Sequence, residues 1–261
     1  MKMKNIIIYF SSTGNSFFAA KFLSEQLDNC TYVPIMDLKP GTTIGDDDNT
    51  NIGFIFPTYF FSIPKFFIKG IKQLNLNTQA YYYGITTCNG FSGNTGHQLK
   101  TVLERQGCHL SFFSVLKMPG NYIVEYAPPN EDVINKRVID SEKKLSDVAN
   151  TITKRKQELV KKKYALISNI FRKVMYRNHH KWHKDFYTNQ KCTSCSLCKK
   201  ICQFKNIEIY EGRPCWLSNC EHCVACMQLC PNQAIEYANK TKQRKRYKNP
   251  KVLYKDLTNI R

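Results

Sequence analysis

The sequence has no apolar run long enough to cross a membrane, and it is short of acidic residues. A membrane-spanning helix needs about 20 consecutive apolar residues, and the run at residues 6–10 has only five. That run is also too short for the core of a secretory signal peptide, so we expect a cytoplasmic protein without a membrane span. Lys and Arg number 39 against 20 Asp and Glu, which gives a formal net charge of +19.

Familiar signatures of nucleotide sites and active sites are also missing. The chain lacks the G-x4-G-K-[ST] loop of nucleoside triphosphate sites and the G-x-G-x-x-G fingerprint of dinucleotide sites. No acid–base or nucleophilic constellation stands out, and we assign no catalytic residue. These absences favour an electron carrier over a self-contained reductase.

Cysteine, in contrast, is abundant and patterned. Eight of the twelve cysteines form two copies of C-x2-C-x2-C-x3-C. The first copy is Cys192, Cys195, Cys198 and Cys202, and the second is Cys220, Cys223, Cys226 and Cys230. This is the ligand spacing of a bacterial ferredoxin with two [4Fe–4S] clusters. Pro231 follows the second copy as that pattern requires, whereas Gln203 follows the first.

In this pattern the fourth cysteine of each copy ligates the other cluster. We therefore expect one cluster on Cys192, Cys195, Cys198 and Cys230, and the other on Cys220, Cys223, Cys226 and Cys202. The alternatives are zinc, which would need two C-x2-C pairs rather than two quartets, and disulfides, which suit a small secreted chain. We expect Cys30, Cys88 and Cys108 to be core residues and Cys215 to be buried or half-buried.

The front half alternates buried strands with amphipathic helices. We expect strands at residues 6–10, 31–36, 52–56, 80–88 and 109–118, helices at 17–27, 95–106 and 132–156, and a surface loop at 42–51. Such alternation predicts an α/β fold with a parallel sheet covered by helices on both faces. Ligands in such sheets bind beyond the carboxyl ends of the strands.

A hydroxyl-rich turn follows the first strand and opens the first helix. It consists of Ser11, Ser12, Thr13, Gly14, Asn15 and Ser16. Backbone N–H groups at a helix N-terminus attract a phosphate, the hydroxyls add donors, and Gly14 provides backbone freedom. An ordinary Ser/Thr helix cap is the alternative. The turn resembles the S-x-T-G-N-[ST] phosphate loop of the flavodoxin family, which implies bound FMN and a five-stranded sheet of order 2-1-3-4-5.

The same resemblance assigns the ring of the flavin to two further loops. Flavodoxins place aromatic residues after the third strand, where this chain has Pro57, Thr58, Tyr59 and Phe60. The loop after the fourth strand, with Thr87, Asn89, Gly90 and Gly93, is suited to present backbone amides to the polar edge of the ring. The alternative for the aromatic residues, Phe61 above all, is plain core packing.

Together the two halves resemble the flavodoxin–ferredoxin fusion proteins, the EFR-type ferredoxins, over residues 4–125 and 186–238. We expect a flavodoxin-like FMN-binding domain at 1–156, a basic helical linker at 157–184, a small α+β 2[4Fe–4S] ferredoxin domain at 185–238 and a basic tail at 239–261. The resemblance implies electron transfer between FMN and the clusters. A flavin-dependent reductase of a small substrate, fed by the clusters, is the alternative, and a redox-sensing or nucleic-acid-binding module is a third.

The positive charge is concentrated in two segments. Residues 154–184 contain eleven Lys and Arg against one Glu, and residues 239–261 contain nine against one Asp, so the remainder carries a net charge of only +1. Such segments are either solvated helix faces with a disordered tail, or a surface that steers an acidic redox partner. Nucleic acid is a weaker option because no base-reading module is visible. The nearby His179, His180 and His183 suggest an amphipathic surface more than a metal site.

Overall fold

The computed structural model describes residues 3–158, 165–177 and 179–258. Its contacts divide the chain into two compact units. The sheet unit comprises Met1–Ser11, Asn15–Met118 and Ile134–Arg172, and the cysteine unit comprises Ser12–Gly14, Pro119–Val133 and Lys173–Arg261. The middle of the hydroxyl-rich turn is therefore grouped with the cysteine unit.

Five parallel strands form the sheet of the first unit. They are β1 (Lys4–Tyr9), β2 (Cys30–Pro34), β4 (Thr50–Pro57), β6 (Tyr81–Cys88) and β7 (Leu110–Lys117). They lie in the order β2-β1-β4-β6-β7, which is 2-1-3-4-5 when these five are counted along the chain. The predicted flavodoxin-like α/β fold is therefore confirmed, because this is the strand order of that doubly wound class.

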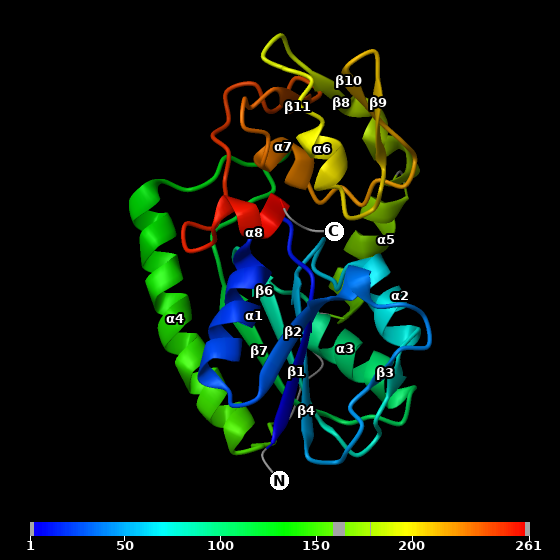
Figure 1. The fold of residues 1–261 in the computed structure, drawn as a ribbon, viewed down its shortest axis with the longest axis vertical. Helices are drawn as coiled ribbons and strands as arrows, with labels where there is room; N and C mark the ends of the chain where they lie inside the picture. Colours follow the sequence, from blue (N-terminus) through cyan, green and yellow to red (C-terminus); the bar gives the residue numbers. More distant parts are fainter. Residues whose placement is uncertain (1–2, 159–164, 178, 259–261) are drawn as a thin grey trace. The chain divides into compact units, whose positions relative to one another are not determined.

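Helices cover both faces of this sheet, as the buried strand sequences require. Helices α1 (Asn15–Gln26) and α4 (Glu131–Thr153) lie on one face, and α2 (Lys65–Lys72) and α3 (Thr95–Glu104) lie on the other (Figure 1). Within the sheet, Gly53 lies opposite Tyr83, whose ring would be 2.2 Å from a Cβ at Gly53. Glycine is needed there because the fully buried tyrosine ring occupies the space of a side chain.

Two elements of the sheet unit differ from the sequence expectation. The predicted surface loop at 42–51 contains the short strand β3 (Thr43–Ile44), which pairs with β5 (Asn75–Leu76), and the last two residues of the loop begin β4. Helix α2 was not predicted, although its buried Phe67 and Ile71 have the four-residue spacing of one helix face.

The cysteine unit contains two copies of one strand–loop–helix–strand motif. The first copy has β8 (Phe186–Thr188), α6 (Leu197–Lys200) and β9 (Ile207–Tyr210), and the second has β10 (Arg213–Trp216), α7 (Ala225–Gln228) and β11 (Ile235–Tyr237). The first strand of each copy pairs antiparallel with the last strand of the other, so β8 pairs with β11 and β10 with β9. Each copy therefore depends on the other for its sheet.

Two helical segments, both in basic sequence, complete the described chain before the cysteine motifs. They are α5 (Ala165–Tyr176) and a 3₁₀ segment (His179–Asp185), and a second 3₁₀ turn (Ile35–Asp37) follows β2.

Residues 159–164 and 178 of the predicted linker, and 259–261 of the predicted tail, lie outside the described residues, as do the side chains of His179 and His180. Among the helices that are described, none combines the length and the apolar character needed to span a membrane.

The basic C-terminal segment is packed rather than solvated. Tyr247, Asn249, Val252 and Leu257 are each 2% exposed or less, and α8 (Tyr254–Thr258) ends the described chain. The alternative of a disordered tail is wrong for residues 239–258. Apolar side chains between the Lys and Arg residues anchor this segment. A count of Lys and Arg alone does not reveal these apolar side chains.

Candidate functional site

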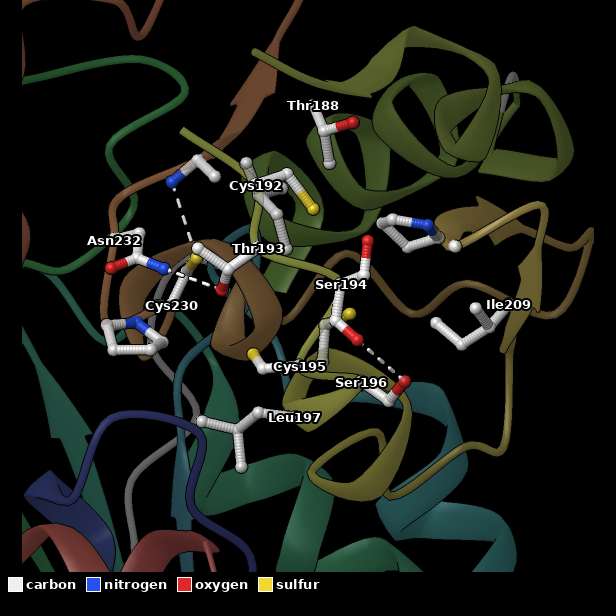
Figure 2. A pocket seen from close by; sticks show the side chains of 16 residues that line it. Thr188, Cys192, Thr193, Ser194, Cys195, Ser196, Leu197, Ile209, Cys230 and Asn232 are labelled. Carbon is white, nitrogen blue, oxygen red and sulfur yellow. Dashed lines mark hydrogen bonds between the residues drawn. The ribbon is translucent and has the colours of Figure 1, made fainter. Parts of the chain in front are cut away.

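The first three cysteines of the first motif share a pocket with the last cysteine of the second. This pocket of the cysteine unit is lined by Cys192, Cys195, Cys198 and Cys230, and Figure 2 shows Thr193, Ser194 and Ser196 on the loop that forms one wall. Burial, with a smaller contribution in the same direction from the thiols of Cys195, Cys230 and Cys192, raises the pKa of the Cys198 thiol to about 11. The fold has brought together four thiols that the crossed pattern assigns to one cluster.

The other four cysteines of the two motifs also gather. Burial raises the pKa of the Cys220 thiol to about 11, and the nearby Cys202 thiol acts in the same direction. Burial likewise raises the pKa of Cys223 and of Cys226, and Cys202 again adds to both increases. Cys202 therefore lies near Cys220, Cys223 and Cys226 of the second motif.

The two cysteine loops have matching backbones. Ser194 and Ser196 have φ angles of 57° and 59°, and their counterparts 28 positions later, His222 and Val224, have 52° and 56°. A left-handed backbone on either side of the middle cysteine is uncommon outside glycine. This strain recurs at equivalent positions, which is typical of a functional site.

Backbone N–H groups donate to the fourth cysteine of each motif. Asn206 donates to Cys202 Sγ and Ala234 donates to Cys230 Sγ, both at 3.3 Å. Hydrogen bonds of this kind stabilise a thiolate, because they place positive partial charge beside the sulfur. The arrangement can therefore hold two sets of four thiolates.

No single-ion metal site is apparent in residues 3–158, 165–177 and 179–258, where no three His, Cys, Asp or Glu side chains are grouped to hold one metal ion. The cysteines outside the motifs differ in exposure. Cys108 is buried as expected, whereas Cys30 and Cys88 are only partly buried. Cys215 is exposed, which corrects the expectation of a buried or half-buried thiol. It follows Pro214 on β10 and points away from the core because side chains alternate along a strand.

The hydroxyl-rich turn is buried throughout, with Ser11, Ser12, Thr13, Asn15 and Ser16 each 8% exposed or less. Gly14 has a φ of 102°, so the predicted need for backbone freedom is confirmed.

Within the cysteine unit, two partners hold Thr13 in place. Asn121 Nδ2 donates to Thr13 Oγ1 at 2.7 Å, and the Asn249 backbone N–H donates to the carbonyl of Thr13 at 2.9 Å. Because the hydroxyl oxygen of Thr13 accepts this bond, its own proton is left to donate elsewhere.

Three of the predicted loops meet within the sheet unit. The hydroxyls of Ser16 and Thr87 lie 2.9 Å apart, and the Thr58 backbone N–H donates to the carbonyl of Thr87 at 2.9 Å. Thr58 also shares a hydroxyl–hydroxyl bond of 2.8 Å with Thr86. These bonds join the start of α1 to the ends of β4 and β6 at one edge of the sheet. The last residue of β4 is Pro57.

The aromatic loop after β4 is a tight, strained turn. Tyr59 and Ser62 exchange two backbone hydrogen bonds of 2.9 Å, and between them Phe60 and Phe61 have φ angles of 49° and 59°. Two adjacent non-glycine residues in the left-handed region each cost about 1–3 kcal/mol, and such strain is common at ligand sites.

The neighbouring Gly-rich loop packs closely on this turn. A Cβ at Gly93, which has a φ of 61°, would lie 2.1 Å from the carbonyl oxygen of Phe61. The ring of Phe61 contacts Phe91 and Phe171, with centroids 5.2 Å and 4.7 Å away, so the packing alternative describes Phe61.

Arg137 was not predicted from the sequence and holds the Gly-rich loop. Its guanidinium donates to Asn89 Oδ1 and, at 3.2 Å, to the carbonyl of Met118. Asn89 and Gly90 are exposed at the tip of this loop. Nothing local in the sequence identifies Arg137, because it reaches the loop from α4, nearly fifty residues away.

No protein-family model and no curated protein sequence matches the chain. Solved structures that resemble it include rubredoxin oxygen:oxidoreductase from Desulfovibrio gigas, 12% identical with a TM-score of 0.37, covering 58% of this chain and 35% of that one. The Flv1 flavodiiron core from Synechocystis sp. PCC6803 is 12% identical with a TM-score of 0.36, covering 59% and 36%. Trp repressor binding protein from Bacillus subtilis is 16% identical with a TM-score of 0.35, covering 55% and 99%. The chain thus spans about a third of the first two, and likenesses at these scores carry no conclusion about its activity.

Proposed function

We propose that this chain is an electron-transfer protein that couples one FMN to two [4Fe–4S] clusters. One observation carries the proposal: Cys230 of the second motif lines the same pocket as Cys192, Cys195 and Cys198 of the first. Crossed quartets are the ligand arrangement of two-cluster ferredoxins. A zinc ribbon would need two C-x2-C pairs rather than two quartets.

The number of thiols at the pocket supports a cluster. The four thiolates of a [4Fe–4S] cube bind four different irons, so they stand farther apart than the ligands of one metal ion. Four thiols lining one pocket match the number of ligands that one cube needs. The raised pKa values mean that the free thiols resist deprotonation. Bound iron would overcome this resistance, because a metal deprotonates the thiol that it coordinates.

The hydroxyl-rich turn supports FMN through its donors. The first backbone N–H groups of α1 have no partner within the helix. Thr13 keeps a hydroxyl proton available because Asn121 donates to its oxygen. Buried hydroxyls cost stability unless they are hydrogen-bonded, and a phosphate can accept several such bonds at a helix N-terminus. The strained turn at Phe60 and the adjoining Gly93 loop are then the elements available to the flavin ring.

Bound iron–sulfur clusters carry electrons one at a time, whereas FMN can carry one or two, so the pair can interconvert single electrons and electron pairs. In this proposal the residues of the chain would hold these groups and tune their potentials. Asn206 and Ala234 place N–H dipoles at two of the sulfurs, and Arg137 fixes the loop that carries Asn89. We assign no proton transfer to any side chain.

The physiological partner is proposed to be an acidic redox protein in a reducing cytoplasm. Lys173, Arg177, Lys181 and Lys184 are exposed in the basic segment before the cysteine motifs. A cationic surface of this kind accelerates association with an acidic partner, and the effect weakens as salt is added. The rate of electron exchange with an acidic carrier should therefore fall as ionic strength rises.

The test is anaerobic reconstitution of the full chain with iron, sulfide and FMN. We expect about eight irons and one flavin per chain, as two cubes require. Cys230→Ser should lose about half of the iron, whereas Cys215→Ser, which removes an exposed thiol outside both quartets, should retain all of it. Zinc in place of iron, or equal iron in the two variants, would contradict the clusters. Protein that stays colourless after FMN is added would contradict the flavin.

A further inference from the structure

The segment that follows β7 contacts both Thr13 and the second cysteine motif, all within the cysteine unit. The side chain of Asn121 donates to Thr13, and its backbone carbonyl accepts a hydrogen bond of 2.5 Å from Gln228 Nε2. The hydroxyl of the next residue, Tyr122, lies 2.7 Å from Nδ1 of His222. His222 belongs to the second cysteine loop, and Gln228 is the last residue of α7. Two adjacent residues therefore join Thr13 to this motif at two points.

Gln228 closes this connection into a ring of hydrogen bonds. It is 5% exposed, and while its Nε2 donates to Asn121, its Oε1 accepts from the backbone N–H of Tyr247 at 2.7 Å. Two residues beyond Tyr247, the backbone N–H of Asn249 donates to the carbonyl of Thr13 at 2.9 Å. A carbonyl needs a donor and an N–H needs an acceptor, so the two partners of the amide fix its orientation. One side chain of α7 thus holds both segments that hold Thr13.

The C-terminal segment also packs directly on the hydroxyl-rich turn. A Cβ at Gly14 would lie 3.1 Å from the Cβ of Asn249 and 3.3 Å from the Cβ of Val252. Interiors packed this closely transmit small displacements instead of absorbing them. The position of this segment therefore bears on the shape of the turn.

The repeat in the cysteine unit shows that this connection is particular to the second motif. The counterparts of Gln228 and His222, 28 positions earlier, are Lys200 and Ser194, and both of these are exposed. Gln228 and His222 are instead 5% and 4% exposed. In the described structure the connection to the hydroxyl-rich turn therefore runs through the second motif.

We propose that Gln228 is a positioning residue that couples FMN binding at the hydroxyl-rich turn to the cluster on Cys202, Cys220, Cys223 and Cys226. The inference rests on the proposed function and adds to it a dependence of one cofactor on the other. FMN should bind more tightly once this cluster is in place. Because coupling between two binding sites is reciprocal, bound FMN should also strengthen the binding of this cluster.

The coupling passes through α7, which carries both Cys226 and Gln228. This helix has only four residues, and a helix so short depends on its tertiary contacts. A cluster bound to Cys226 restricts the helix and so places the amide of Gln228, two residues further on. With the amide in place, Asn121 and the segment of Tyr247 are already held where they bind Thr13. FMN then binds more tightly, because its binding does not have to order them.

The first test compares Gln228→Met with Lys200→Met in the full chain with its clusters reconstituted, by titration of FMN fluorescence. Methionine has a length similar to that of glutamine and lacks the amide. The FMN dissociation constant should rise about fivefold in Gln228→Met, a typical coupling between sites. Lys200→Met places the same side chain at the matching position of the first motif and should leave the constant unchanged. About eight irons per chain in both variants would show that the clusters are retained.

A double-mutant cycle with Asn121→Ala separates positioning from general destabilisation. If Gln228 acts through Asn121, the double variant should weaken FMN binding by clearly less than the product of the two separate effects. Effects of about fivefold and about tenfold that multiply to about fiftyfold would show that the two residues act independently. That result would overturn the positioning role.

The dependence on one cluster is tested with matching cysteines of the two motifs. Cys223→Ser removes a ligand of the coupled cluster, and Cys195→Ser removes the equivalent ligand of the other. FMN affinity should fall about fivefold in Cys223→Ser and stay near the wild-type value in Cys195→Ser. Equal affinities in the two variants would overturn the coupling. The same comparison decides the matter if Gln228→Met does not take up its clusters.

Failure of this inference can be told apart from failure of the proposed function. If the wild type takes up about eight irons and one FMN, an unchanged FMN affinity in iron-loaded Gln228→Met would overturn the role of Gln228 alone. A wild type that binds no iron or no FMN would overturn the proposed function itself.

Discussion

The guanidinium of Arg246 lies 3.0 Å from the carboxylate of Glu236, and both side chains are more than nine-tenths buried. Arg246 also donates to the carbonyl of Ile235 at 2.9 Å, and Thr241 bonds to the same carboxylate. Glu236 belongs to β11, directly after the second cysteine motif. Arg246, a cation of the C-terminal segment, therefore forms a buried ion pair within the cysteine unit and is not a free surface charge.

The first prediction concerns this ion pair. Arg246→Ala should destabilise the cysteine unit by about 3–5 kcal/mol, because it leaves a buried carboxylate without its partner. Lys245→Ala removes the same charge from an exposed neighbour and should change stability by less than about 0.5 kcal/mol. Urea unfolding of both variants checks this. Equal midpoints would mean that the pair contributes nothing beyond net charge.

A second prediction concerns Asn121 and the hydroxyl-rich turn. Asn121→Ala removes the bond that orients the Thr13 hydroxyl, and we expect FMN affinity to fall about tenfold, which corresponds to about 1.4 kcal/mol. Asn232→Ala is the matched control, because Asn232 makes a similar bond of 2.9 Å to Thr193 in the first cysteine loop. Quenching of FMN fluorescence on titration gives both affinities. An unchanged affinity in Asn121→Ala would remove Thr13 from the phosphate site.

The third prediction compares two glycines of one loop. Gly93→Ala places a Cβ against the carbonyl of Phe61 at a left-handed backbone, and should cost more than about 1 kcal/mol of stability and weaken FMN binding. Gly90→Ala meets nothing within 4 Å and should be nearly neutral. Thermal unfolding with and without FMN separates the two effects. Similar behaviour of the two variants would contradict the close packing of the aromatic and Gly-rich loops.

A fourth prediction follows from the environment of Cys88. Burial raises the pKa of this thiol to about 11, although Lys117, Lys144 and Arg137 act in the opposite direction. A raised pKa means a neutral thiol, so at pH 8 only about one molecule in a thousand carries the reactive thiolate. Alkylation of Cys88 by iodoacetamide should be slow at pH 8 and accelerate about tenfold per pH unit up to about pH 11.

The comparison for this experiment is Cys215, whose exposed thiol should be modified sooner at pH 8. Mass spectrometry of the alkylated peptides resolves the two sites. Equal rates at pH 8 would show that the Cys88 thiol is not shielded.

Much of the sheet unit could be predicted, because strands and helices leave short-range patterns. The run at residues 6–10 and the alternation that follows it identified all five strands of the main sheet, and the spacing of glycine and hydroxyl residues identified the turn at Gly14. The elements that were not predicted are short. Strands β3 and β5 have two residues each and therefore show no periodicity, and the two buried side chains of α2 form only a narrow apolar stripe.

The crossed grouping of Cys230 with Cys192, Cys195 and Cys198 was also predictable from the cysteine spacing, since the x2-x2-x3 gaps are a local constraint on how thiols converge. The exposure of Cys215 was not predicted, because strand β10, which turns alternate side chains outward, was itself not predicted. The basic tail was also misjudged, because charge composition suggests solvation while four buried side chains determine its packing.

By itself the sequence determined the five strands of the sheet, the two cysteine motifs and the position of the hydroxyl-rich turn, because covalent spacing and periodicity act over a few residues. Only the tertiary structure decided that Asn121 holds Thr13 and that Arg246 pairs with Glu236. Each of these relationships depends on how separate segments pack. Packing is decided by the summed burial of many side chains, which no local pattern of residues contains.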